Sequence, residues 1–205
     1  MQFIAFDLGN VLIDVDLQPF WSAVDDIQCV REDVEDLLRL YERPEFCGDV
    51  DMLDVFRDAL NNTEEAQYLT DSWCKGLKPD EQMFNFISSL KSEGVKIAYL
   101  SNIGSRHLSF MRNRYPEFMK CASVEHMSCE VGAAKPSLIY YQSFLLQHDD
   151  FKGCTYLDDR MENVLMGSKC KFNSVHFDLE ALKKEKPSVL KNEINKIKER
   201  MLRGC

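Results

Sequence analysis

Six residues with the chemistry of an active site stand beside apolar runs or at a predicted helix start. They comprise a carboxylate, a Ser-Asn pair, a lysine and an acid pair: Asp7, Ser101, Asn102, Lys135, Asp158 and Asp159. Taken singly, each has an ordinary explanation as a strand end, a turn, a helix cap or a surface lysine. As a set they are informative, because the carboxyl ends of parallel strands meet at one edge of a sheet and would bring these side chains together.

The acid pair is the most informative of these signals. Asp158 and Asp159 follow the apolar run TYL, and two adjacent carboxylates repel each other unless a cation or solvent relieves the repulsion. Asn163, a helical turn further on, could orient one of these carboxylates or cap a helix. The pair therefore indicates a site for a hard, oxygen-seeking cation such as Mg²⁺.

This set of side chains suits the transfer of a phosphoryl group to a carboxylate. Mg²⁺ between Asp7 and the acid pair would offset their repulsion as a phosphate approaches. Asp7 could then attack phosphorus, while the Ser101 hydroxyl holds phosphoryl oxygens and Lys135 neutralises the shared charge. The product would be an aspartyl phosphate that water hydrolyses.

Short apolar runs alternate with helical patterns along most of the chain. We expect strands at residues 2–6 and 95–102, and further strands in the segments CASVEH, CTYLDD and NSVHF. A helix is predicted over residues 79–94, because apolar residues recur there at helical spacing and Gly94 follows as a cap. Strands that alternate with helices predict an α/β fold with a doubly wound parallel sheet.

One segment lacks this alternation. Residues 16–78 contain helical patterns such as VEDLLRLYERPEF and MLDVFRDAL but no convincing strand, so we expect an all-helical insertion there. It divides the chain into a core of residues 1–15 and 79–205 and an inserted domain of residues 16–78, placed where it could act as a lid. Residues 179–203 are predicted to form an accessory helix with one apolar face.

Composition excludes several classes of function. The chain of 205 residues has 45% hydrophobic residues and a formal net charge of -9, which argues against disorder and against nucleic acid as a partner. It has no apolar run long enough to cross a membrane and no secretory signal pattern, so we expect a cytoplasmic protein. Its 8 cysteines form no C-x-x-C pair and are expected to be reduced thiols.

In order and in residue type, the motifs resemble those of the haloacid dehalogenase superfamily. They are FDLGNVL at 6–12, YLSN at 99–102, KP at 135–136 and LDDRMEN at 157–163, and together they span almost the whole chain. The DLGNV form is similar to the subgroup containing bacterial glucose-1-phosphate phosphatase and the phosphatase domain of soluble epoxide hydrolases. The resemblance implies a Rossmann-like core, a four-helix cap and Mg²⁺-dependent hydrolysis of a small phosphate ester, which we expect to be a sugar phosphate.

The resemblance also implies roles for individual residues. By position, Asp7 matches the nucleophile, Lys135 the stabilising lysine, and Ser101 the phosphate-binding hydroxyl, with Asn102 beside it as a substrate-binding residue. These roles agree with the chemistry inferred from the residue types.

The metal ligands implied by the resemblance are Asp7, the acid pair and a backbone carbonyl two residues after the nucleophile, which belongs to Gly9. We expect Asp159 to be a direct ligand and Asp158 to act through a water or a neighbouring group. The motif alone leaves their order open.

Gly9 departs from the pattern of most of the resembled phosphatases, which place an aspartate there to protonate the leaving oxygen and activate water. Glycine can do neither, and losing a positioned acid–base group typically removes about 10²- to 10⁴-fold of rate. We therefore expect turnover to fall steeply as the leaving alcohol becomes more basic. The resembled subgroup shares this glycine, and the nearby Asp14 and Asp16 are expected to be solvated loop acids.

Two other functions remain open. The same superfamily contains metal-independent 2-haloacid dehalogenases, but these resemble FDAYGT after the first strand and need no acid pair for a metal. A protein that binds a phosphorylated metabolite, with turnover lost at Gly9, is the other alternative.

Specificity is expected to come from the insertion. The stretch ERPEFCGDVD, residues 42–51, is the best candidate for a turn that dips toward the site, since Gly48 permits a tight backbone there. Trp21, Phe46 and Trp73 are interpreted as core aromatics. Arg106 and His107 stand close enough to Ser101 to meet a substrate, but a helix surface explains them equally well.

Overall fold

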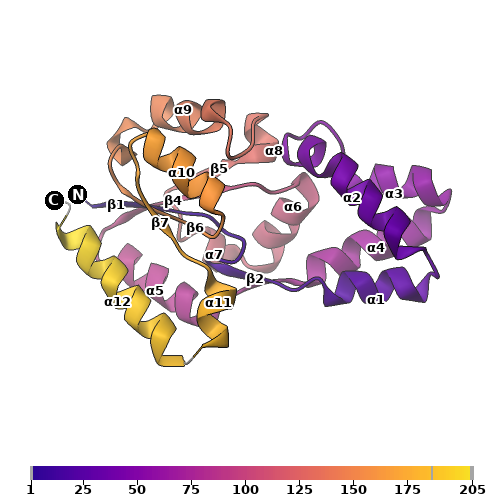
Figure 1. The fold of residues 1–205 in the computed structure, drawn as a ribbon, viewed down its shortest axis with the longest axis horizontal. Coiled ribbons are helices and arrows are strands. Elements are labelled where there is room, and N and C mark those ends of the chain that lie inside the picture. Colours follow the sequence, from indigo (N-terminus) through magenta and orange to yellow (C-terminus); the bar gives the residue numbers. More distant parts are fainter. Residues whose placement is uncertain (1, 186, 204–205) are drawn as a thin grey trace.

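A five-stranded parallel sheet forms the centre of the molecule (Figure 1). The structure is a computed structural model that describes residues 2–185 and 187–203. The strand order is β5-β4-β1-β6-β7, and every neighbouring pair is parallel. The bounds are β1 Phe3–Phe6, β4 Lys96–Ser101, β5 Val124–Met127, β6 Thr155–Asp158 and β7 Asn173–His176. The predicted doubly wound parallel sheet is confirmed.

Helices cover both faces of this sheet because alternate strand residues point to opposite sides. Ile4 and Phe6 of β1 pack among apolar side chains of the helices on one face, whereas Ala5 packs against those on the other. The first face carries α5 Glu81–Ser92, α6 Ser105–Arg114, α7 Pro116–Met119, α11 Leu179–Lys184 and α12 Pro187–Arg203. The second carries α9 Leu138–Gln147, α10 Met161–Lys169 and the 3-10 helix η1 Asp149–Phe151.

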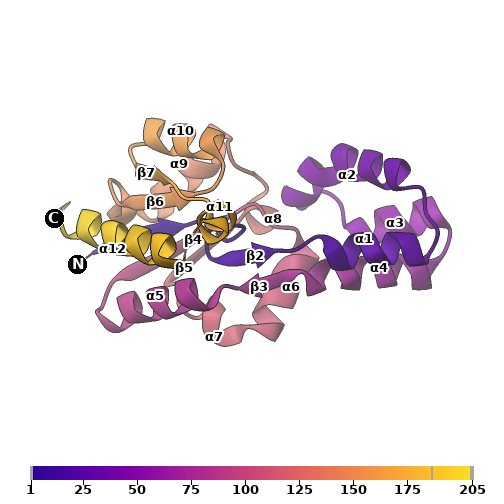
Figure 2. The same cartoon turned by 60° about the horizontal axis from the view of Figure 1, so that its bottom comes forward.

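Four consecutive helices stand apart from the sheet and pack on one another (Figure 2). They are α1 Gln18–Asp26, α2 Arg31–Phe46, α3 Met52–Leu60 and α4 Thr63–Lys75, and we call them the helical insertion. Side chains cap two of them, since Asp51 accepts from Leu53 N and Asn62 accepts from Glu64 N and Glu65 N. The insertion has its own apolar cluster around Phe20 and Phe56.

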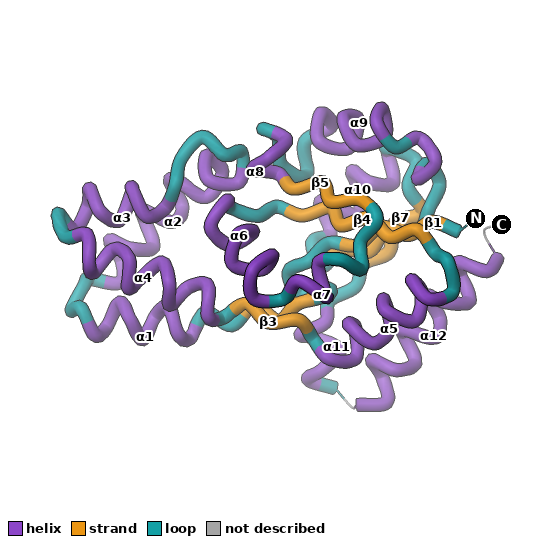
Figure 3. The backbone as a smooth tube through the Cα atoms, turned by 180° about the vertical axis from the view of Figure 1, so that it is seen from behind, coloured by secondary structure: helices purple, strands orange, loops and turns teal. Residues whose placement is uncertain are grey.

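A two-stranded ribbon joins the insertion to the sheet (Figure 3). Strand β2, Ile13–Val15, pairs antiparallel with β3, Leu77–Pro79. The expectation of no strand within residues 16–78 was therefore wrong at Leu77 and Lys78. Three residues are too few for a period-two pattern to be visible, and it is the pairing with β2 that makes this segment a strand.

The ribbon is also bonded to the turn that follows β1. Ile13 N donates to Leu8 O (2.9 Å), and Asn10 N donates to Ile13 O (2.9 Å). On the other side, Asp80 N donates to Leu12 O (3.0 Å). The turn after β1 and the base of the insertion therefore form one hydrogen-bonded unit.

The chain after β7 forms two helices, α11 and α12, where the sequence analysis predicted one. Leu190, Ile197 and Met201 of α12 are buried against the sheet-side core, as their spacing predicted. Among the residues described, every helix is too short or too polar to cross a lipid bilayer. The 7 cysteines in this part of the chain are free.

Candidate active site

Three neighbouring strands end at the same edge of the sheet and deliver the predicted side chains. Asp7 directly follows β1, Ser101 ends β4 and Asp158 ends β6. Because β1 lies between β4 and β6, these three positions are adjacent. Lys135 comes from the loop between α8, Ser128–Val131, and α9.

Lys135 is a buried cation with every N–H satisfied. Its side chain is 0% exposed, and Nζ donates to Leu100 O (2.8 Å) and Asp158 Oδ2 (2.7 Å) and lies 2.9 Å from Asp7 Oδ2. Burial by itself lowers the pKa of a lysine, but the carboxylates of Asp7 and Asp158 outweigh burial and raise the pKa of Lys135. The lysine is therefore charged and links two strands.

Asp158 is held by four hydrogen-bond donors. Oδ2 accepts from Lys135 Nζ and the Tyr156 hydroxyl, and Oδ1 accepts from Arg160 N (2.9 Å) and Asn163 Nδ2 (2.9 Å). Burial opposes ionisation, but Lys135 and these hydrogen bonds lower the pKa of Asp158. Asn163 thus orients a carboxylate of the acid pair, one of the two roles predicted for it.

Asp7 and Asp159 have fewer partners. Burial, with repulsion from Asp158 and Asp159, raises the pKa of Asp7 to about 7 against the attraction of Lys135. Burial and Asp158 also raise the pKa of Asp159, whose side chain accepts one long hydrogen bond from Asn10 Nδ2 (3.4 Å).

The three carboxylates form a cluster suited to a divalent cation. One oxygen from each of Asp7, Asp158 and Asp159 lies within 4.8 Å of the others. When all three are ionised, Lys135 balances one negative charge and leaves two. A bound divalent cation of the oxygen-seeking type would neutralise the remainder.

Asn102 binds the backbone of Lys135, and Gly9 leaves open space beside the site. Asn102 Nδ2 donates to Lys135 O (2.9 Å), and its Oδ1 accepts from Lys135 N (2.8 Å), so this side chain clamps the lysine loop. A Cβ added at Gly9 would meet only Val15 Cγ2, at 3.6 Å, which is ordinary van der Waals contact. The absence of a side chain at Gly9 is therefore not imposed by crowding.

A cavity of about 320 Å³ opens over this cluster and reaches the insertion. Its floor includes Asp7, Ser101 and Asp159. Its walls are mainly apolar and come from the ribbon, the insertion and the loop after β4: Ile13, Val15, Leu17, Phe46, Trp73, Leu77 and Ile103. Phe46 and Trp73, interpreted as core aromatics from the sequence, thus line the cavity, whereas Trp21 packs against Phe20.

The end of α2 docks on the core beside this cavity. Arg43 Nη1 donates to Lys135 O (3.4 Å), and Glu42 and Phe46 line the cavity. Gly48 has a φ of 75°, and a Cβ there would lie 2.5 Å from the Cys129 carbonyl oxygen. The segment 42–51 therefore approaches the site, with residues 42–46 as the last turn of α2 and residues 47–51 as the turn and loop that follow it.

The sequence analysis left His107 open between a substrate contact and a helix surface, and it did not single out Glu45 within the segment 42–51. Both are buried, at 4% and 7% exposure, and Glu45 Oε1 lies 3.7 Å from His107 Nδ1. A signal for Glu45 exists: it follows Tyr41 by four residues on a helix face that also carries Val34 and Leu38, where a charged side chain is unexpected. For His107, the sequence offered no way to separate a helix surface from a cavity wall.

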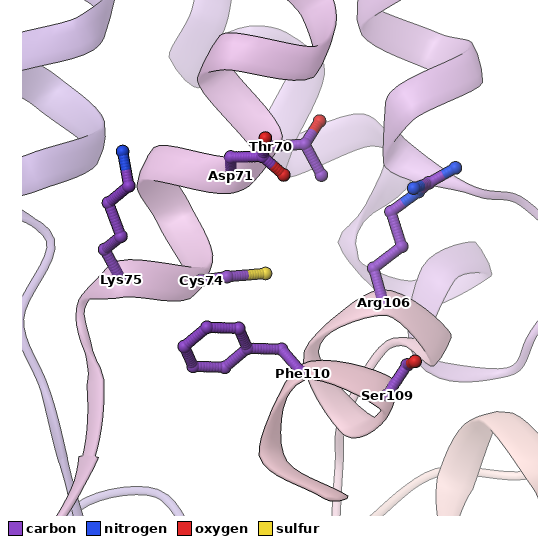
Figure 4. Close-up of a pocket in the computed structure, with 7 residues that line it drawn as sticks. All are labelled: Thr70, Asp71, Cys74, Lys75, Arg106, Ser109 and Phe110. Carbon is purple, nitrogen blue, oxygen red and sulfur yellow. The ribbon is translucent and has the colours of Figure 1, made fainter. Parts of the chain in front are cut away.

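A second cavity, of about 360 Å³, lies between α4 and α6 (Figure 4). It is lined by Thr70, Asp71, Cys74, Lys75, Arg106, Ser109 and Phe110. Burial raises the pKa of the Cys74 thiol to about 12, so this cysteine is unreactive. None of the clustered carboxylates contributes to this cavity.

The architecture recurs in solved structures of haloacid dehalogenase (HAD) family proteins. A HAD family enzyme of Bacteroides thetaiotaomicron, in complex with magnesium and inorganic phosphate, has a TM-score of 0.74 at 17% identity, covering 86% of this chain and 93% of that chain. A HAD-like family hydrolase of Porphyromonas gingivalis has a TM-score of 0.72 at 19% identity, covering 90% and 97%. The chain therefore has the haloacid dehalogenase fold, as its motifs predicted.

One relative is also similar in amino-acid sequence. A sesquiterpene phosphatase of Aspergillus oryzae is 26% identical over 168 residues, which is 78% of this chain and 81% of that protein. No protein-family model matches the sequence.

Proposed function

We propose that this protein is a phosphatase that hydrolyses a small phosphate ester through a phosphorylated Asp7. One observation carries the proposal: Asp7, Ser101, Lys135 and Asp159, from four separate segments, line a single cavity at the carboxyl edge of the sheet. Similarity to the Aspergillus oryzae phosphatase supports the same activity.

Each residue has a role that its contacts suit. Asp7 presents a carboxylate to phosphorus, held by Leu8 N (2.6 Å from Oδ1) and Lys135. Ser101 and nearby backbone N–H groups bind phosphoryl oxygens, and Asn102 fixes the backbone of Lys135. Lys135 stabilises the negative charge shared by Asp7 and the phosphate.

The carboxylate cluster fits Mg²⁺, and HAD family neighbours were crystallised with magnesium. Asp7, Asp159 and the Gly9 carbonyl would hold the ion, which would supply charge neutralisation for the incoming phosphate. Asp158 already accepts hydrogen bonds on both oxygens, so we propose that it acts through its neighbours and that Asp159 is the direct ligand.

The organic part of the substrate was expected from the sequence to be a sugar. The cavity walls favour a more apolar group instead, because Val15, Leu17, Phe46 and Trp73 offer few hydrogen-bonding atoms to sugar hydroxyls. The name of the Aspergillus oryzae relative, a sesquiterpene phosphatase, agrees with an apolar substrate. We propose a phosphate ester of an apolar alcohol.

The test is phosphate release from p-nitrophenyl phosphate and from a panel of isoprenoid and sugar phosphates, with and without Mg²⁺. The proposal expects Mg²⁺-dependent release that Asp7→Asn abolishes and that Asp150→Asn, a matched change at an exposed position, leaves intact. Release that is equal in the wild type and Asp7→Asn would refute it. Halide release from a 2-haloacid without metal would instead identify the dehalogenase alternative.

A further inference from the structure

His107, in the wall of the cavity that holds the proposed reaction centre, has a ring nitrogen without a hydrogen-bond partner among the described residues. The residue lines the same cavity as Asp7 and Gly9, and its Nε2 atom is buried with no hydrogen bond among the described residues. Leaving a buried polar atom without a hydrogen-bond partner is energetically unfavourable, so such atoms are rare in folded proteins. A substrate oxygen in the cavity would supply the missing partner.

The other nitrogen of the ring faces an acid. Nδ1 lies 3.7 Å from Glu45 Oε1, a distance slightly longer than a hydrogen bond. The ring is held in place by Trp73, whose ring centroid is 4.7 Å away in an edge-on arrangement. Glu45 packs directly against Gly104, because a Cβ at Gly104 would lie 2.1 Å from Glu45 Oε1. The imidazole and the acid are thus both packed against neighbouring groups.

Burial of both groups, with nearby acids in the case of Glu45, favours a neutral imidazole and a protonated acid. Burial, then Asp51 and Glu42, raises the pKa of Glu45 to about 7. Burial lowers the pKa of His107 to about 4. Arg106, the residue before His107, forms an ion pair with Asp51, with Nε 2.5 Å from Oδ1.

We propose that His107 is the general acid–base that Gly9 cannot provide and that Glu45 is its positioning residue and proton reserve. The inference rests on the proposed phosphatase function. It requires the Glu45–His107 contact to shorten by a few tenths of an ångström when substrate binds, as catalytic hydrogen bonds commonly do.

The protons balance over the two steps. As Asp7 forms its bond to phosphorus and the ester P–O bond breaks, His107 Nε2–H gives its proton to the leaving oxygen, and Glu45 passes a proton to Nδ1. Water then attacks the aspartyl phosphate, gives a proton to Nε2, and Nδ1–H returns one to Glu45. The pair ends as it began, with alcohol and inorganic phosphate as products.

The experiment compares kcat/KM of the wild type and His107→Gln, with Mg²⁺, over aryl phosphates of increasing phenol pKa and one alkyl phosphate. Gly9 alone predicts a steep dependence on leaving-group pKa, whereas a general acid at His107 predicts a shallow dependence in the wild type. His107→Gln should match the wild type within about threefold for the most acidic phenol and fall about 10²- to 10⁴-fold for the alkyl phosphate. His148→Gln, outside the site, is the matched control and should keep the shallow dependence.

Glu45→Gln gives a second readout that does not depend on His107→Gln folding. In the wild type, kcat/KM for the alkyl phosphate should fall above about pH 7 as Glu45 loses its proton. Glu45→Gln should lose this limb and show the steep leaving-group dependence.

A steep dependence already in the wild type, or a uniform loss across the series in His107→Gln, would overturn the assignment while leaving the phosphatase function intact. No Asp7-dependent release from any ester would overturn both.

Discussion

Arg106 Nε donates a 2.5 Å hydrogen bond to Asp51 Oδ1, joining the first turn of α6 in the core to the N-cap of α3 in the helical insertion. Both side chains are about one-third exposed. The contact therefore ties the insertion to the core. Because both parts line the cavity that contains Asp7, we expect its loss to change substrate affinity rather than the chemical step.

Asp51→Asn keeps the N-cap, because Asn caps as well as Asp, but removes the charge. We expect it to raise KM several-fold with little change in kcat. Arg106→Gln should do the same, and a double-mutant cycle should give a coupling of about 0.5–1 kcal/mol, discounted for partial exposure. Additive effects of the two changes would contradict this linkage.

Lys135 is the only ammonium within ion-pair distance of Asp7 and Asp158 among the described residues. Lys135→Met should abolish turnover and lower the free energy of unfolding by about 3–5 kcal/mol, because it strands buried carboxylates. Urea denaturation measures the change, and added Mg²⁺ should restore part of the stability by neutralising the same charge. A variant as stable as the wild type without metal would show that the carboxylates are not both ionised.

Gly9 has room for a side chain, so Gly9→Asp should fold with a stability within about 1 kcal/mol of the wild type. In the His107→Gln background, it should restore much of the lost kcat/KM for alkyl phosphates, since it brings a carboxyl group to the reaction centre. Gly9→Asn, of nearly the same size, is the control and should restore nothing. Equal rescue by both would point to packing instead of proton transfer.

Glu45 and His107 should have opposite effects on the pH dependence of the free energy of unfolding. The pKa of Glu45 rises from its ordinary 4.5 to about 7 in the folded protein. Between these two pH values the folded protein keeps a proton on Glu45 that the unfolded chain has lost, so the free energy of unfolding falls with rising pH. The pKa of His107 falls from its ordinary 6.5 to about 4 in the folded protein. Between these two pH values the folded protein lacks a proton that the unfolded chain holds on His107, so the free energy of unfolding rises with pH.

The two slopes, each up to about 1.4 kcal/mol per pH unit, should largely cancel in the wild type between pH 4.5 and 6.5. Relative to the wild type, Glu45→Gln should gain stability with rising pH in this window, and His107→Gln should lose it. Denaturation curves at several pH values measure both. Parallel curves for all three proteins would show that neither pKa is displaced.

A substitution at Leu17, which lines the cavity, tests whether the apolar wall binds the substrate. Leu17 is 42% exposed and precedes α1 as an N-cap without a side-chain hydrogen bond, so Leu17→Asn should not weaken the helix. We expect KM for an isoprenoid phosphate to rise about tenfold and KM for p-nitrophenyl phosphate to change little. Comparable increases for both substrates would argue against a binding role for the apolar wall.

The sheet and the carboxylate cluster were predictable because their signals are local. The three strands that carry the site, β1, β4 and β6, are mainly apolar runs, and Asp7, Ser101 and Asp158 stand at their ends, which parallel topology brings together. Lys135 lies in a loop, and its sequence surroundings alone do not distinguish it from a surface lysine. It was predicted to belong to the site only because the other motifs occur in the same chain.

The ribbon and the Glu45–His107 pair could not be predicted in this way. Strand β3 exists through its pairing with β2, which no pattern of three residues reveals. Glu45 and His107 are 62 positions apart and meet only because α2 docks on α6, a tertiary contact that neither helix encodes alone. The burial that displaces both pKa values arises from the same docking.

The hydrogen bonds between the ribbon and the Leu8–Ile13 turn connect the helical insertion to the backbone next to Asp7, the proposed nucleophile. Because Ile13 N donates to Leu8 O, we expect a displacement of the four helices to be transmitted to the backbone beside Asp7. A ligand that shifts α1–α4 would then change the position of this carboxylate without entering the cavity.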